Sequence, residues 1–193
     1  MPINIADFQA NLPGGGARPN LFEVDLRDVS GLEKKTVAGD NTRGSFLVKA
    51  TSLPATTISR IAVPYRGRNV IMPGVREFEE TWSTTIINDT DFAHRKWIEN
   101  WMNAIHSHET NVGEFKLDAL STDLSVYQLD HKDGARIRGY KFINAWPSEL
   151  GAIDLAADSN DAVQEYECQW AYSYWMNDDQ SVTAVGDGTN TVD

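Results

Sequence analysis

Apolar and polar side chains alternate along much of the chain between residues 46 and 88. Val, Ile, Thr and aromatic residues occupy nearly every second position there, which is typical of half-buried antiparallel strands. Turn signals interrupt the alternation at Leu53-Pro54, Pro64, Arg66-Gly67 and Pro73-Gly74. The pattern therefore predicts strands at residues 46–52, 57–63, 69–72 and 78–87.

The second and third of these strands predict an arm with proline-guarded ends. Its turn is basic, because Arg60, Arg66 and Arg68 lie in or near it. An arm spanning residues 53–73 is long for a connection within one domain. We therefore expect it to reach a neighbouring subunit.

A helical stripe follows the strands. Between residues 91 and 107, large apolar side chains recur with a period of about 3.6 residues: Phe92, Trp97, Ile98, Trp101, Met102 and Ile105. We expect Asp89, Thr90 or Asp91 to cap its start. The apolar stripe is expected to close the open flank of a β-sandwich or rolled barrel.

Three further strands are predicted after the helix, at residues 124–129, 135–145 and 164–175. In the last one Tyr166, Cys168, Trp170, Tyr172 and Tyr174 share one face, and Glu165, Glu167, Gln169, Ala171 and Ser173 share the other. The polar face fits the wall of an aqueous channel, and it equally fits an ordinary solvated face. The predicted fold class is mainly β, an antiparallel β-sandwich or rolled β-barrel with one flanking α-helix and a long protruding hairpin.

Six tryptophans raise the possibility of a monomeric sugar-binding β-sandwich, since exposed aromatic rings stack on sugars. Trp97 and Trp101, however, lie on the helical stripe, and most of the others fall within or beside strands. Core packing explains most of them. Trp146-Pro147 is expected to mark the exit of a strand, where proline ends the hydrogen-bonded ladder.

Length and charge narrow the class of protein. A chain of 193 residues suits one core, and its formal charge of −11 repels polyanions, which argues against a DNA-binding module. The expected parts are an N-terminal arm at 1–16, a β-barrel domain at 17–175 and an acidic, flexible tail at 176–193. No apolar run approaches the ~18 residues of a membrane span.

No residue pattern supports catalysis, a metal or a cofactor. His106 and His108 point in different directions on a helix, and His94 and His131 lack ligand partners nearby in the sequence. We therefore expect histidines that lie at the surface or have their hydrogen bonds satisfied. The glycine-rich residues 13–16 lack the ending of a phosphate-binding loop. The only cysteine, Cys168, lies in a predicted strand rich in aromatic residues and is expected to be a core residue. One cysteine forms no internal disulfide, which fits a reducing compartment. We therefore expect a protein that is not an enzyme and binds no cofactor.

Six segments, taken in order, resemble the inner tail-tube protein of contractile-tailed bacteriophages. They are ARPNLFEVDL at 17–26, KATSLP at 49–54, the turn at 65–68, FEETWSTTIIND at 78–89, NAWPSELG at 144–151 and YSYW at 172–175. The helix lies between the fourth and fifth of them. The chain departs from the family pattern in a polar insertion at 27–44, in residues 111–125 and in the tail after Trp175.

The resemblance implies a structural virion protein that self-assembles into stacked hexameric rings, the inner tube through which DNA is ejected into the host. It implies a continuous β-barrel wall and a surrounding sheath, with baseplate and tail terminator proteins as further partners and assembly in the host cytoplasm. DNA would pass through without specific binding. The hairpin would contact the adjacent ring, with interface candidates Leu53, Pro54, Arg60, Val63, Tyr65, Arg66, Arg68 and Met72. The lumen-facing candidates are Glu165, Glu167 and Gln169.

Two alternatives remain at this point. The same resemblance extends to the tubes of extracellular contractile injection systems and of type VI secretion, and the sequence separates these poorly from a phage tail. The monomeric sugar-binding sandwich is the remaining alternative, but it leaves the six ordered segments unexplained.

Overall fold

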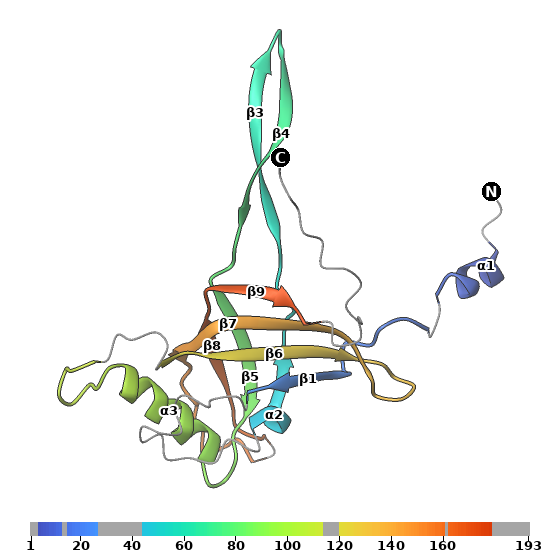
Figure 1. Ribbon diagram of the computed structural model, residues 1–193. Coiled ribbons are helices and arrows are strands. Elements are labelled where there is room, and N and C mark those ends of the chain that lie inside the picture. The colour runs from blue at the N-terminus through green and yellow to red at the C-terminus, as the bar shows by residue number, and fades with distance from the viewer. Residues whose placement is uncertain (1–3, 13–14, 27–43, 114–119, 161, 179–193) are drawn as a thin grey trace.

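The computed structural model describes residues 4–12, 15–26, 44–113, 120–160 and 162–178 (Figure 1). Its elements in chain order are α1 (Ile5–Ala10), β1 (Phe22–Asp25), α2 (Gly44–Leu47), β2 (Val48–Thr51), β3 (Thr57–Tyr65), β4 (Arg68–Glu77), β5 (Thr81–Ile87), α3 (Ala93–Ile105), β6 (Thr122–Leu129), β7 (Arg136–Leu150), β8 (Glu165–Ala171) and β9 (Tyr174–Asn177). Most of the predicted insertion, and the predicted tail beyond residue 178, lie outside the described residues.

One long strand holds the body of the molecule together. The first part of β7 pairs with β6, and its last part, from Trp146 to Leu150, pairs with β8. The hydrogen-bonded order is β1-β6-β7-β8-β5-β2, with β9 also paired to β7, and all these pairings are antiparallel. Because β7 belongs to both halves, the sheet rolls around a shared core (Figure 1). The predicted mainly β fold, with a flanking helix and a protruding hairpin, is confirmed.

Aromatic rings fill the core. Trp101 lies between Trp97 and Trp170, with ring centres 5.2 Å and 5.7 Å away. Trp82 stacks on Phe142 at 4.5 Å. None of the six tryptophans is exposed, so core packing explains them, as predicted, and no tryptophan forms an open platform for a sugar ring.

Helix α3 closes the flank of this core. His94, Trp97, Ile98 and Trp101 are its buried residues, and Met102 and Ile105 pack beside them. The predicted cap is wrong. Phe92, in a left-handed conformation with φ of 56°, stands at the N-cap, and its side chain makes no capping hydrogen bond. Asp89 instead accepts the Thr90 N–H through its carboxylate and the Phe92 N–H through its carbonyl, which makes a tight turn before the helix.

Four strand predictions need correction. The strand predicted at 78–87 begins only at Thr81, as β5. Residues 46 and 47 belong to helix α2, so β2 starts only at Val48. The predicted strand at 164–175 is two strands, because the chain bends after Tyr172 and Ser173 donates its N–H to the Ile143 carbonyl instead. Strand β7 does not end at Pro147 but continues to Leu150, with a register shift between Pro147 and Glu149 that accommodates the missing proline N–H.

Among the described residues, no helix is both long and apolar enough to span a membrane.

Candidate functional site

The most prominent feature of the molecule is the hairpin of β3 and β4, which projects well beyond the body (Figure 1). Arg66 and Gly67 join its strands, and both have positive φ, 43° and 80°. Two such residues form a type I′ turn, whose twist matches that of the flanking strands. Tyr65 and Arg68, the residues on either side of this turn, pair with each other. The sequence pattern therefore located the turn correctly.

Pro64 and Pro73 lie inside the hairpin strands rather than ending them, which corrects their interpretation as turns. Pro64 pairs with Asn69, and Pro73 pairs with Arg60. A two-stranded hairpin has two outer edges, where a residue without an N–H costs no ladder hydrogen bond. The prolines also make these edges poor templates for uncontrolled strand addition.

The hairpin exposes apolar side chains on both of its faces. Ile61, Val63, Val70 and Met72 share one face, and Ile71 lies on the other. Their exposed fractions range from 41% to 57%. Only Ser59 and Gly74 are half-buried in these two strands, and every other residue in them is exposed. An isolated two-stranded hairpin is marginally stable in water, so this one requires a covering surface.

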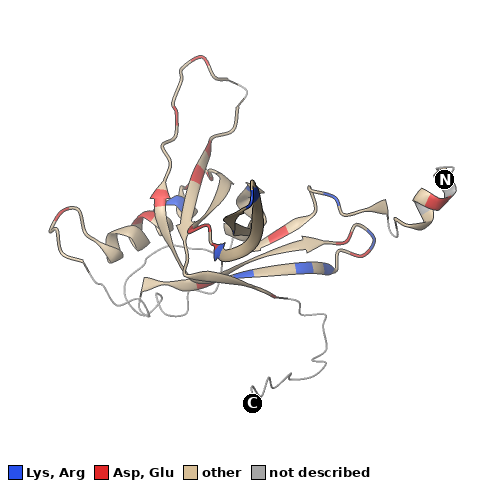
Figure 2. Ribbon diagram, turned by 90° about the horizontal axis from the view of Figure 1, so that it is seen from above, with Lys and Arg blue, Asp and Glu red and all other residues tan. Residues whose placement is uncertain are grey.

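The hairpin is basic although the chain is acidic. Strands β3 and β4 and the turn between them contain one carboxylate, Glu77, and four arginines: Arg60, Arg66, Arg68 and Arg76. Together they carry a net charge of +3. The rest of the chain then carries −14, since the total is −11. Within the described residues no carboxylate forms an ion pair with Arg66, whose guanidinium lies 5.4 Å from the Tyr65 ring centre. Figure 2 shows acidic residues spread over several elements of the body.

Most of the predicted interface residues come together on this hairpin: Arg60, Val63, Tyr65, Arg66, Arg68 and Met72. Leu53 and Pro54 do not, because they lie in the connection between β2 and β3 at its base. Leu53 is 43% exposed and Pro54 is half-buried.

The predicted polar face of β8 is present as a structural feature. Tyr166, Cys168 and Trp170 are buried, whereas Glu165, Glu167 and Gln169 turn outward. Tyr174, predicted on the same face, lies instead in β9 and is 45% exposed. Burial raises the pKa of the Cys168 thiol, as expected for a core cysteine.

Neighbouring strands hold these outward carboxylates. Glu165 accepts a hydrogen bond from the Lys49 ammonium group at 2.5 Å, across β5 from β2. Glu167 accepts one from the Ser83 hydroxyl on β5. The outward face of β8 is therefore an ordered polar surface. Glu167 on this face is exposed and has no basic partner among the described residues, whereas Glu165 pairs with Lys49.

His94 departs from the expectation of a surface or hydrogen-bonded histidine. It is 2% exposed, its ring stacks on Trp97 at 5.4 Å, and neither ring nitrogen has a hydrogen-bond partner among the described residues. Burial lowers the pKa of His94 from 6.5 to about 4, so the ring is neutral at pH 7. Nowhere in the described part of the chain do three or more His, Cys, Asp or Glu side chains gather to hold a metal ion.

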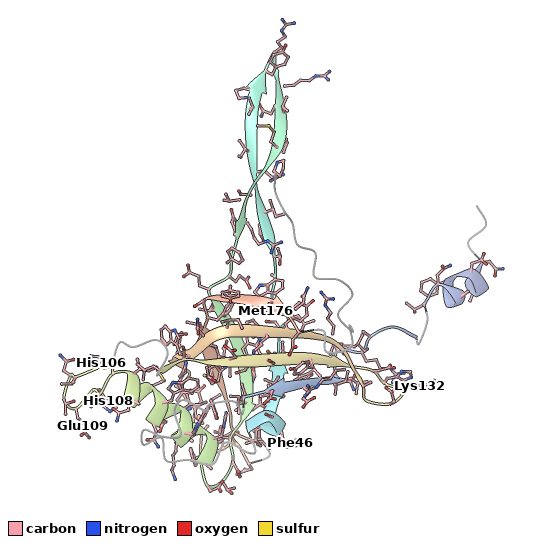
Figure 3. The ribbon with its side chains drawn as sticks, in the orientation of Figure 1. Phe46, His106, His108, Glu109, Lys132 and Met176 are labelled. Atoms are coloured by element: carbon pink, nitrogen blue, oxygen red, sulfur yellow. The ribbon has the colours of Figure 1, made fainter. Side chains whose placement is uncertain are left out.

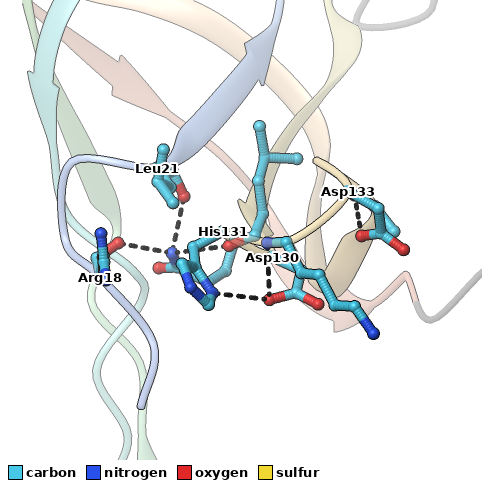
Figure 4. A network of polar contacts seen from close by, with 9 residues as sticks. Arg18, Leu21, Asp130, His131 and Asp133 are labelled. Carbon is cyan, nitrogen blue, oxygen red and sulfur yellow. Dashed lines mark hydrogen bonds and ion pairs between the residues drawn. The ribbon is translucent and has the colours of Figure 1, made fainter. Parts of the chain in front are cut away.

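The segment just before β1 is tied to the end of β6, next to the turn between β6 and β7 (Figure 4). The Gln128 side-chain amide donates to the carbonyls of Arg18 and Leu21, at 2.8 Å and 2.6 Å. In the turn itself, the Asp130 carboxylate accepts the Lys132 N–H and lies 3.6 Å from His131 Nδ1. The two hydrogen bonds from Gln128 anchor the chain at residues 18 and 21, and the arm with α1 extends away from the body before that point (Figure 1).

Sequence reasoning missed a groove between α3 and β7. We call it the α3–β7 groove; it has a volume of about 380 Å³, and its lining includes Met102, Ile105, His106, His108, Trp146 and Pro147. The sequence did contain a sign of this groove, since Met102 and Ile105 lie at the edge of the apolar stripe of the predicted helix. Only the packing of α3 beside the last part of β7 brings the two apolar sets together.

Comparisons with known proteins agree with this geometry. The profile of a family described as "Phage tail tube protein" matches residues 17–178. Tail tube protein gp19 of Enterobacteria phage T4 is 30% identical over 167 residues, covering 84% of this chain and 92% of that protein.

Two solved structures share the fold. The sheath/tube terminator of the extracellular contractile injection system PVC gives a TM-score of 0.57 at 15% identity, covering 84% of this chain and 96% of that one. A chain of the anti-feeding prophage baseplate, solved with six-fold symmetry, gives 0.54 at 12% identity, covering 84% and 95%. Because the family match and the T4 relative each span most of the sequence, this chain belongs to the phage tail tube protein family, whose members are structural components of the virion tail.

Proposed function

We propose that this chain assembles into hexameric rings that stack into the inner tube of a contractile tail, the conduit for DNA ejection. The ring body in this proposal is the predicted domain at 17–175 extended to residue 178, because Met176 and Asn177 pair with β7 as part of β9. Residues 1–16 are its arm, and the predicted tail follows the body. The observation that carries it is the projecting hairpin of β3 and β4, with apolar side chains exposed on both faces. Exposed apolar surface of this extent indicates a protein interface.

A second copy of the chain provides the matching surface. The hairpin carries +3 and the remainder −14, so the hairpin of one ring is attracted to the body of a copy in the next. Charge complementarity of this kind guides association and register more than it adds affinity. Apolar contacts from Val63, Tyr65 and Met72 supply the affinity, and Arg60, Arg66 and Arg68 pair with carboxylates of the neighbour. Leu53 and Pro54 contact it at the base of the hairpin.

The polar face of β8 lines the channel in this proposal. Glu165, Glu167 and Gln169 project from one sheet face, with Ser83 and Lys49 beside them. An acidic wall repels the phosphate backbone, so DNA passes without being held. The sheet edges that one copy leaves open are closed by lateral pairing with its neighbours, which removes an aggregation hazard.

The partners follow from the assembly. The family match supports a tail with a sheath around the tube and with a baseplate and a terminator at its ends. The fold likeness to the contractile injection proteins supports the same architecture, and the six-fold symmetry of the baseplate structure supports a hexamer. The assembled protein is a virion component, and assembly takes place in the host cytoplasm.

The second candidate function is the tube of an extracellular contractile injection or type VI-like secretion system. The TM-scores above 0.5 for injection-system chains favour it. The two candidates differ in what fills the tube. Nuclease-protected DNA in ejecting particles supports a phage tail, whereas protein cargo in the tube supports an injection device.

Negative-stain electron microscopy of the purified protein over a concentration series tests self-assembly. Hollow six-fold rings and stacked tubes are the expected result. The same series is repeated with sheared tails of phage T4 as seeds, so that a barrier to nucleation does not hide the ability to assemble. A chain that stays monomeric in both series contradicts the proposed assembly.

A further inference from the structure

Helix α1 presents an apolar face that no described residue of its own chain covers. Ile5, Phe8 and Leu12 have helical spacing in the sequence, and the hydrogen bond from the Asn11 N–H to the Asp7 carbonyl continues the helical turn up to Asn11, next to Leu12. Their exposed fractions are 73%, 65% and 40%. A short helix of 6 residues is not stable in water by itself. Its formation therefore depends on a surface that receives this face.

The α3–β7 groove is a suitable receiving surface. Met102, Ile105 and Trp146 form its apolar floor, and all three pack against the core, so the floor is rigid. Ser148 and Asn103 lie at its polar margin. Small amphipathic helices bind to apolar grooves through side chains spaced at i, i+3 and i+7, which is the spacing of Ile5, Phe8 and Leu12.

The helix and the groove lie on opposite flanks of the molecule. In Figures 1 and 2 α1 extends from one side of the body and α3 lies at the other. Figure 3 places His106 and His108, at the groove, across the body from Lys132 in the turn between β6 and β7. A chain cannot easily fill its own groove with this arm, because the arm leaves the body beside that turn, where Gln128 anchors Arg18 and Leu21.

We infer that α1 of one copy docks in the α3–β7 groove of the next copy around the ring. Two different surfaces on opposite flanks make a head-to-tail contact, and such contacts close into rings when the rotation between copies allows it. The arm thus links each subunit to its lateral neighbour, in addition to the stacking contact of the hairpin. This inference rests on the proposed assembly into rings.

Mixed cross-linking tests the contact. One chain carries Ala10→Cys on α1, and a second, affinity-tagged chain carries Asn103→Cys at the groove; both positions are exposed. Native Cys168 is fully buried and does not react. Because Ala10 lies on the side of α1 away from the docked face, the mixed and assembled chains are treated with a bismaleimide cross-linker long enough to reach around the helix. The expected product is a covalently linked dimer of one tagged and one untagged chain. The control mixture replaces the second chain by Lys132→Cys, at the opposite flank, and is expected to give no such dimer.

A second variant tests the apolar basis of docking in the full chain. Phe8→Asp places a charge in the apolar face, and we expect the fraction assembled at a given concentration to fall about tenfold, with an unchanged melting temperature. Ala10→Asp adds the same charge at an exposed position on the other side of α1 and is expected to assemble as the parent does. Tubes that form without the mixed dimer, or a Phe8→Asp chain that assembles normally, overturn the docking inference alone. A chain that remains monomeric and gives no mixed dimer overturns both the inference and the proposed assembly.

Discussion

The indole Nε1 of Trp170 donates a hydrogen bond of 2.9 Å to the hydroxyl of Thr84, in the centre of the core. Both residues are fully buried, Trp170 on β8 and Thr84 on β5. The Thr84 hydroxyl donates its own proton to the Cys168 carbonyl at 3.3 Å. The single Thr84 hydroxyl on β5 thus provides a hydrogen-bond partner for a buried N–H and for a buried carbonyl, both on β8.

Removing this hydroxyl is expected to destabilise the subunit. Thr84→Val keeps the shape but leaves the Trp170 N–H buried without a partner, which costs about 1–3 kcal/mol of unfolding free energy. Urea unfolding followed by tryptophan fluorescence measures the loss. Thr85→Val, on the opposite face of the same strand, is the matched control and should change stability much less. Equal stability of the Thr84→Val and parent chains would contradict this role.

Stability is expected to fall in mild acid because of His94. Burial lowers the pKa of His94 to about 4, while the unfolded chain binds the proton near 6.5. The unfolded state therefore binds more protons between these two values, so stability is lost as the pH falls from about 6.5 towards 4. The full loss is on the order of 3 kcal/mol.

The variant His94→Phe tests this assignment, since it keeps a ring against Trp97 but has no group to protonate. Thermal unfolding measured from pH 7.5 to pH 4.5 should show a shallower decline for His94→Phe than for the parent. His106→Gln, at an exposed histidine, should follow the parent. Parallel curves for His94→Phe and the parent would exclude His94 as the cause.

Charge reversal at the tip of the hairpin is expected to weaken stacking without affecting the fold. Arg66→Glu/Arg68→Glu alters two exposed residues at the turn, so the melting temperature should stay the same, while the yield of tubes falls relative to single rings in electron micrographs. Arg18→Glu/Lys132→Glu changes the net charge equally at exposed positions elsewhere and is the control. An unchanged tube yield for the tip variant would count against the hairpin as the stacking contact.

A positive charge on the polar face of β8 is expected to make assembled tubes retain DNA. Glu167→Lys replaces an exposed carboxylate in the proposed channel wall, and double-stranded DNA fragments loaded into these tubes should co-sediment at low salt and dissociate as salt increases. Glu109→Lys, in the exposed loop after α3, makes the same charge change outside the proposed channel. Equal DNA retention by the two variants would show that residue 167 does not face the channel.

Local patterns predicted much of the fold. The alternation of Glu165 to Trp170 placed one face of β8 in the core, and the spacing of Trp97, Ile98 and Trp101 placed α3 on it. The turn at Arg66-Gly67 was also legible, because Gly67 adopts its positive φ without steric cost. In these cases the preferences of neighbouring residues and their burial favour the same structure.

The errors occurred where distant contacts outweigh local preference. Pro147 continues a strand because β8 pairs with it across a register shift, and His94 enters the core because it lies on the buried side of α3, beside Trp97. The break between β8 and β9 arises from the hydrogen bond of Ser173 to Ile143, about thirty residues earlier in the chain.

The sequence by itself therefore determined the strands, the long helix, the polar face of β8 and the basic hairpin, since each depends on the period and chemistry of neighbouring residues. The tertiary structure alone decided that His94 is buried without a hydrogen-bond partner among the described residues, and that α1 and the α3–β7 groove lie on opposite flanks. The physical reason is that exposure and grooves depend on which residues the fold brings together across long sequence separations, and no local pattern records that.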